Sequence, residues 1–263
     1  MDSYARYYRR YRSARLRALV IISFAILQFP LAVSASLVAI PSIADDLNVN
    51  AVWVSWIPAV FLLASLVSQL PGGRLSDLIG LKKAFMGSTF IFALGSLIAG
   101  LSPSIEVLLI ARVMQGMAGA ILASAGMAMI SRIYAAGGRR AALGWMTSAI
   151  YFGMTAGPLL GGWLVDQFGW RSVFILPIPI LACVMLGLRL SVPGEWISAE
   201  KHRIDWLGTS LFAGGIVLLF YGSTQLVNVW GITSSVLGVF IIYLFVRWSR
   251  RVNFPLVNID IMV

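Results

Sequence analysis

Arg112 is the residue whose type and surroundings point most directly to chemistry. It stands inside an apolar stretch, about two helical turns after Glu106, with the amide of Gln115 one turn further on. A guanidinium keeps its proton at physiological pH, so Arg112 can hold a fixed positive charge but cannot release a proton. A charge in apolar surroundings is costly and usually serves a site or a pairing network. The alternative is an arginine near the outer surface that snorkels outward or stabilises helix packing.

The other reactive residue types are isolated. Cys183 is the sole cysteine and His202 the sole histidine, so these two residue types supply neither a disulfide framework nor a metal cluster. The sequence shows no nucleophile paired with a base and no glycine-rich phosphate loop. We therefore expect that the protein is not an enzyme and that it uses no metal or organic cofactor.

The stretches around Arg112 are apolar enough to lie in a membrane. Hydrophobic residues make up 59% of the chain and charged residues 11%, whereas a soluble domain carries about 25% charged residues. Seven stretches carry no charge: 18–44, 47–73, 84–105, 113–131, 141–165, 172–188 and 206–246. Six hold one span each, and the seventh must fold back near 224–231, which gives eight spans. Backbone in lipid must bond to itself, so we predict an all-α polytopic membrane protein.

Basic residues concentrate on one predicted side of the membrane. If the N-terminus is cytoplasmic, the inside segments hold eighteen basic residues and the outside loops only Arg171. This positive-inside bias places both termini in the cytoplasm of a multi-pass protein of the cytoplasmic (inner) membrane. The net charge of +10 therefore reflects topology and the lipid bilayer rather than nucleic-acid binding. A cleavable signal peptide is the alternative for the N-terminal region, but its apolar run continues to Ile40, beyond the 7–15 residues of such peptides.

A fourteen-residue segment occurs twice. "GGRLSDLIGLKKAF" begins at Gly72 and "GGWLVDQFGWRSVF" begins at Gly161, 89 residues later. The copies share G-G-x-L-x-D-x-x-G-x-(K/R)-x-x-F, and three predicted spans separate them. Because three is an odd number, the copies should lie on opposite sides of the membrane. A three-helix unit repeated in reversed orientation is typical of secondary transporters of small molecules.

Three motifs resemble signatures of the major facilitator superfamily. The loop "GGRLSDLIGLKK" is similar to its signature between the second and third helices, "IARVMQGMAGA" to its fourth-helix signature, and "GMTAGPLLGG" to the fifth-helix signature of its antiporters. The motif residues are Gly73, Asp77, Gly80 and Lys83 in the loop; Arg112, Gln115 and Gly116 in the fourth helix; and Gly153, Gly157, Pro158, Gly161 and Gly162 in the fifth. The resemblance implies a gating role for the loop, a coupling role for the fourth helix, and sealing against leakage for the fifth.

The remaining chain resembles the fourteen-helix drug/proton antiporter branch, in which two extra helices link two six-helix halves. By this resemblance the chain holds the N-terminal half with its 3+3 inverted repeat plus the two linker helices. The predicted organisation is a basic leader at 1–17, a six-helix bundle at 18–190, a cytoplasmic loop at 191–206, two linker helices at 207–247 and a cytoplasmic tail at 248–263. A second chain or a missing C-terminal half would supply the rest, including the helix N-terminus that the resemblance places opposite Asp77.

The first span departs from the pattern of cation exporters. Where such family members carry an aspartate and an asparagine, the stretch "LAVSASLVAIP" has Ala32 and Leu37. Proton coupling needs a group that changes charge, and no acidic residue lies deep in any predicted span. We expect (multi)drug or small-molecule efflux driven by the proton gradient, with the coupling carboxylate elsewhere. Two alternatives stay open: a truncated or half transporter that needs a partner, and an exporter of neutral or anionic compounds.

Overall fold

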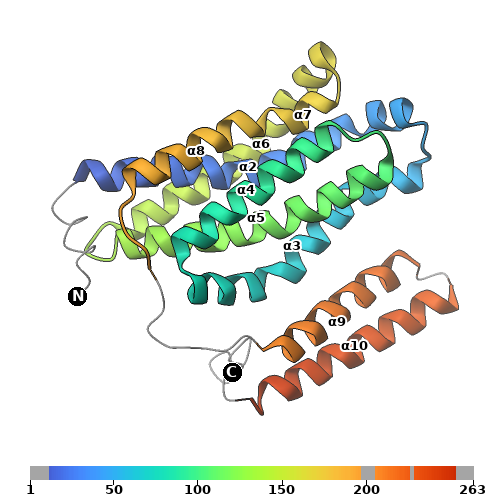
Figure 1. Ribbon diagram of the computed structural model, residues 1–263. Helices are drawn as coiled ribbons and strands as arrows, with labels where there is room; N and C mark the ends of the chain where they lie inside the picture. Colours follow the sequence, from blue (N-terminus) through green and yellow to red (C-terminus); the bar gives the residue numbers. More distant parts are fainter. Residues whose placement is uncertain (1–11, 197–204, 226–227, 253–263) are drawn as a thin grey trace.

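The described chain consists of helices, and short turns join the helices from α2 to α8. The computed structural model describes residues 12–196, 205–225 and 228–252, and within these ranges every regular element is a helix (Figure 1). The helices are α2 (Arg12–Leu47), α3 (Ala51–Ile79), α4 (Leu81–Gly100), α5 (Ile105–Ile133), α6 (Arg139–Phe168), α7 (Arg171–Ile175), α8 (Pro177–Ser191), α9 (Trp206–Thr224) and α10 (Val229–Ser249). This confirms the all-α prediction. His202 and most of the predicted leader and tail lie outside the described residues.

Seven of the described segments are long and apolar enough to cross a membrane, with α7 and α8 counted as one segment, Arg171–Ser191. Pro177 begins α8 and lacks the backbone N–H that would continue the hydrogen-bond ladder of α7, which explains the break. The one predicted span that is not among these seven segments is α6, the fifth in chain order. Its 30 residues are long enough to cross, but its five glycines and its polar residues leave it less apolar than the other seven.

The first six spans form one bundle made of two three-helix units. The first helix of each unit packs along the second helix of the other unit, so that α2 runs beside α6 and α5 runs beside α3. In Figure 1 α4 and α8 complete the bundle, and the described chain begins and finishes at the same end of the structure. This arrangement confirms the predicted 3+3 bundle. We call the end that carries the start of α2, the α3–α4 turn and the start of α6 the basic end, because it holds Arg17, Lys82, Lys83, Arg139 and Arg140.

The last two helices form a hairpin. The predicted fold-back is confirmed, since α9 ends at Thr224 and α10 begins at Val229. Glycines let the two helices approach closely: a Cβ at Gly215 would lie 2.7 Å from the side chain of Ile242, and one at Gly238 would lie 2.8 Å from Leu219. The hairpin also packs against α3 of the bundle.

Candidate functional site

Arg112 lies at the centre of a buried polar layer that joins α2, α3, α4 and α5. Its Nε donates to the carbonyl oxygen of Ile57 at 3.3 Å, one Nη to Oε1 of Gln115 at 3.2 Å, and the other Nη to Oγ of Ser36 at 3.0 Å. The amide of Gln115 in turn donates to Oγ of Ser96 at 2.8 Å. Arg112 and Gln115 are both 0% exposed. The layer therefore links both three-helix units through hydrogen bonds.

Aromatic rings complete the surroundings of the guanidinium. The ring centroid of Phe61 lies 4.3 Å from Cζ of Arg112, and that of Phe174 lies 5.7 Å away. Both rings are within the range of cation–π attraction. Gly116 follows on the same helix, and a Cβ there would strike the carbonyl oxygen of Phe61. Glycine at 116 therefore allows α3 to approach closely enough for Phe61 to stack on Arg112.

The polar layer separates two apolar cores. Along α5, Leu108 and Ala111 belong to the core at one end of the bundle, whereas Ala118 and Leu122 belong to the core at the other end. Arg112 stands between them. The alternative of an arginine that snorkels outward near the surface is therefore wrong, because the side chain is enclosed and satisfied within the bundle.

No carboxylate neutralises Arg112 in the described part of the chain, where the one ion pair joins Arg171 to Asp46. The described acidic residues all lie at helix ends or in connecting segments: Asp45, Asp46, Asp77, Glu106, Asp166, Glu195 and Asp205. Ala32, at the position of the aspartate in cation exporters, is buried in the apolar core, and Leu37 is exposed. The layer can hold a fixed positive charge with dipoles and rings, but it offers no titratable group that could exchange a proton.

The first copy of the repeated segment forms the α3–α4 turn. Gly80 has a φ of 105°, which L-residues rarely adopt, and ends α3. The carboxylate of Glu195, which follows α8, accepts from the backbone N–H groups of Lys82 at 2.8 Å and Lys83 at 3.1 Å. A negative charge at the N-terminus of a helix is favourable, so Glu195 caps α4 from a distant segment. A Cβ at Gly80 would lie 2.5 Å from that carboxylate, so the glycine also leaves room for the cap.

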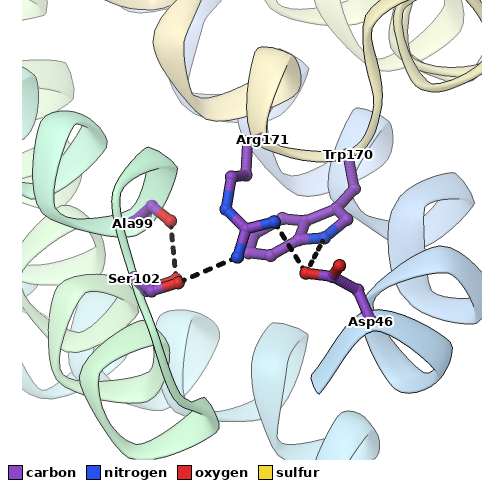
Figure 2. Close-up of polar contacts among 5 residues, drawn as sticks. All are labelled: Asp46, Ala99, Ser102, Trp170 and Arg171. Carbon is purple, nitrogen blue, oxygen red and sulfur yellow. Dashed lines mark hydrogen bonds and ion pairs between the residues drawn. The ribbon is translucent and has the colours of Figure 1, made fainter. Parts of the chain in front are cut away.

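The second copy forms the α6–α7 turn at the other end of the bundle, and Figure 2 shows its contacts. Gly169, with a φ of 78°, takes the place of Gly80. Arg171 pairs with Asp46 at 2.6 Å, and the indole of Trp170 donates to the same carboxylate oxygen at 3.1 Å. Asp46 stands at the end of α2, so a carboxylate from another helix binds this turn as well.

Corresponding basic residues make corresponding bonds in the two copies. Nζ of Lys82 donates to the carbonyl oxygen of Val192, just after α8, at 2.5 Å. Nη of Arg171 donates to the carbonyl oxygen of Ser102, just after α4, at 3.2 Å. Each turn thus fastens its own unit to the end of the third helix of the other unit. The repeat found in the sequence is therefore also a repeat of contacts.

The other residues of the loop motif are less engaged. Asp77 is half-buried in the last turn of α3, and its carboxylate has no hydrogen bond or ion pair with another described residue. The side chain of Lys83 is exposed. Within 4 Å of a Cβ built at Gly73 there is no other atom of the described chain. The structure thus brings Gly80, Lys82 and Lys83 together with Glu195, while Gly73 and Asp77 remain on an open surface.

The fifth-helix motif packs against α2 through one glycine face. A Cβ at Gly157 would strike Oγ of Ser34, and a Cβ at Gly161 would lie 2.8 Å from Cα of Ala35. The hydroxyl of Ser34 also donates to the carbonyl oxygen of Gly153 at 3.3 Å. The expected close packing is therefore present at these three glycines.

The remaining two residues of that motif point elsewhere. Pro158 is exposed, whereas the preceding Gly157 is buried. At Gly162 the nearest atom to a Cβ would be Cγ1 of Val38, at 3.7 Å, which is an ordinary contact. The spacing of Gly153, Gly157 and Gly161 at every fourth residue already places these three on one helix face, and the structure keeps Gly162 off that face.

Several residues that build these sites were not singled out from the sequence. Ser36 and Ser96 complete the polar layer, and Glu195 and Asp46 bind the two turns. A signal existed for the serines, which are polar residues in the apolar stretches of two spans. Glu195 and Asp46 lie in connecting regions far along the chain from their partners, and nothing in their local sequence indicates those partners.

Comparison with known proteins agrees with this architecture. Residues 22–256 match the family model described as Major Facilitator Superfamily. The uncharacterized MFS-type transporter Rv1250 of Mycobacterium tuberculosis is 31% identical over 242 residues, which are 89% of this chain and 41% of that protein.

Two further relatives bear names that state a cargo or a phenotype. The riboflavin transporter RibZ of Clostridioides difficile is 28% identical over 92% of this chain and 53% of its own length. The multidrug resistance protein Stp of M. tuberculosis is 35% identical over 70% of this chain and 34% of its own length. The chain thus spans about half or less of the curated relatives that it matches. With the family model covering most of the chain and the inverted repeat visible in its contacts, this protein belongs to the Major Facilitator Superfamily.

Proposed function

We propose that this chain is the N-terminal part of a transporter that exports drugs or other small molecules by proton antiport. The observation that carries the proposal is the set of relatives named for resistance. Stp is named a multidrug resistance protein, and a lincomycin resistance protein of Streptomyces lincolnensis is 30% identical over 81% of this chain. The fourteen-helix branch fits the hairpin of α9 and α10 after the six-helix bundle.

The geometry supports a bundle that moves as one body. Bonds at both ends and a polar layer between the cores tie the two three-helix units together. Transport in this family architecture proceeds by rocking one bundle against another around a site between them. The second bundle would come from a partner chain or from sequence beyond these residues. In this proposal Arg112, Gln115 and Gly116 take part in coupling cargo to protons, and the contacts of Arg112 also keep the bundle in register.

Orientation and coupling belong to the same proposal. The basic end would face the cytoplasm of a cytoplasmic-membrane protein, because basic residues favour that side. The coupling carboxylate would lie outside the described helices, since their acids stand at helix ends.

A second candidate is an exporter of neutral or anionic compounds without a first-helix carboxylate. It is favoured by the buried positive charge of Arg112 and by Ala32 in the core. The third candidate, a half transporter or a membrane protein that no longer transports, differs from both in giving no flux without a partner.

The test begins with the intact mass of the native protein extracted from its membrane. A mass near 28.6 kDa would direct the search to a partner chain, and a mass near twice that value to a second half of the same chain. The native protein or complex is then reconstituted in vesicles with an imposed pH gradient. Uptake of ethidium, riboflavin and fluorescein reports on cationic, neutral and anionic cargo.

Proton antiport predicts ethidium uptake that a protonophore abolishes and that the 263-residue chain alone does not support. Uptake of fluorescein or riboflavin without ethidium would favour the second candidate. Ethidium uptake that ignores the gradient would refute the antiport, and absence of uptake of all three probes would leave the third candidate.

A further inference from the structure

The hairpin carries a groove that the transport proposal does not use. It has a volume of about 510 Å³ and lies between the end of α10 and the first turns of α9. Its lining residues are Leu211, Phe240, Tyr243, Leu244, Arg247, Trp248 and Arg251. The 21 residues of α10 span about 30 Å, the thickness of a hydrocarbon core. The groove therefore begins inside the lipid region and ends at its boundary with water.

The chemistry of the groove changes along its length. The part deeper in the lipid region is apolar and is formed by Leu211, Phe240 and Leu244. The part at the boundary holds two guanidinium groups, because Arg247 and Arg251 stand one helical turn apart. An apolar slot that leads to two arginines matches a molecule with a hydrocarbon chain and an anionic head.

Neighbouring polar groups hold the walls of the charged end. The phenol oxygen of Tyr243 accepts a hydrogen bond from Nη1 of Arg247 at 3.5 Å. The indole N–H of Trp248 donates to both carboxylate oxygens of Asp205, at 3.1 and 3.2 Å. One of these oxygens also accepts from the backbone N–H of Gly208 at 2.8 Å. Asp205 is thus occupied as the cap of α9 and as the anchor of Trp248.

The two arginines keep their charge available. Both are exposed, and neither forms an ion pair with a carboxylate of the described chain. Guanidinium groups bind phosphate oxygens through paired N–H donors, which is the geometry that a phosphodiester head needs. Aromatic residues such as Tyr243 and Trp248 are favoured at the level of lipid head groups.

We propose that this groove is a binding site for one anionic phospholipid, with an acyl chain along Leu211, Phe240 and Leu244 and the phosphate on Arg247 and Arg251. Charge complementarity selects this occupant over a zwitterionic lipid. The apolar part distinguishes it from a site for free phosphate, which would gain nothing from a hydrocarbon slot. The site does not depend on transport, so it stands or falls separately from the proposed function.

The test counts lipids retained by the 263-residue chain in native mass spectrometry, after purification with phosphatidylglycerol or phosphatidylcholine. Three variants are compared with the wild type: Arg247→Gln/Arg251→Gln, Leu244→Trp, and the control Arg139→Gln/Arg140→Gln. The control removes the same charge from exposed residues that do not line the groove. All substituted side chains are exposed, and size-exclusion profiles verify that each variant is folded.

We expect one tightly retained phosphatidylglycerol on the wild type and on the control, and little phosphatidylcholine on either. Two basic residues near anionic lipid usually raise the lipid affinity by about 30-fold, so Arg247→Gln/Arg251→Gln should lose the lipid. Leu244→Trp keeps the charges but fills the groove, and it should lose the lipid too. If the control variant loses as much phosphatidylglycerol as Arg247→Gln/Arg251→Gln does, general surface charge explains the retention and the proposed site is wrong. Retention by Leu244→Trp, or equal retention of phosphatidylcholine, would also overturn it.

Discussion

The repeated motif contains adjacent glycines that the structure places in opposite situations, which gives a matched pair of substitutions. A Cβ at Gly161 would lie 2.8 Å from Cα and 2.9 Å from the oxygen of Ala35 on α2. Carbon atoms normally approach to about 3.5–4.0 Å, so Gly161→Ala would push the helices apart by roughly 0.7–1.2 Å. At Gly162 the nearest atom would be 3.7 Å away, which needs no movement.

The expected free energies follow from these contacts. Overpacking a tight contact typically costs about 1–3 kcal/mol. Both substitutions also gain the same helix propensity of about 1 kcal/mol for Ala over Gly, so this term cancels when the two variants are compared. We therefore expect Gly161→Ala to be less stable than Gly162→Ala by about 1–3 kcal/mol, and Gly162→Ala to be at least as stable as the wild type.

The assay is reversible unfolding of the purified chain in mixed micelles with increasing sodium dodecyl sulfate. The nine tryptophans provide a fluorescence signal, and circular dichroism provides a second probe that a local change near one tryptophan does not affect. Equal destabilisation by the two substitutions would refute the close approach of α2 and α6. In the first copy the same order is expected with a smaller difference, because Gly72 faces the movable side chain of Ile121 and Gly73 faces open space.

Three further changes test the other contacts. Arg112→Lys keeps the charge but cannot reach three acceptors at once. Transport by the native protein or complex should therefore fall at least about tenfold, with an unchanged amount of protein in the membrane. A loss of membrane protein as large as the loss of transport would assign Arg112 to packing alone. Glu195→Gln removes the charge from the cap of α4 and should cost about 1 kcal/mol in the same unfolding assay; an unchanged midpoint would contradict capping. Single cysteines at Lys83 and Gln167, in an otherwise cysteine-free chain, should react with an impermeant maleimide from opposite sides of oriented vesicles. Reaction from the same side would contradict the inverted repeat.

Much of the fold could be predicted because lipid imposes simple rules on sequence. Charge-free stretches of the right length mark helices, since backbone in lipid has no other partner. The need for a fold-back followed from length, because one helix of 41 residues would be about twice as long as the membrane is thick. Its position between Thr224 and Val229 followed from the polar residues and glycine that gather there. The less apolar composition of α6 did not conceal it, because residues 141–165 carry no charge and are numerous enough to cross the membrane.

The site could be predicted only where its residues are unusual for their surroundings. Arg112 stands out as a charge within a span, but its depth did not follow from the sequence. The periodicity of apolar residues places a side chain on one face of its own helix, but it does not show which other helix packs against that face. The cap by Glu195 was beyond reach for the same reason, since its hydrogen bonds cross 113 and 112 residues of sequence.

The two turns show how an inverted repeat can be stabilised without identical residues. Lys82 and Arg171 occupy the same position in the motif and bind equivalent carbonyl groups, at Val192 and Ser102. The carboxylates differ: Glu195 binds backbone N–H groups, whereas Asp46 binds side chains. Exposed ion pairs contribute little to stability. The α6–α7 turn therefore depends less on charge than on the hydrogen bonds that Trp170 donates to Asp46 and Arg171 donates to Ser102. The Glu195 cap neutralises a helix terminus, and its loss should therefore loosen the basic end more than loss of Asp46 loosens the opposite end.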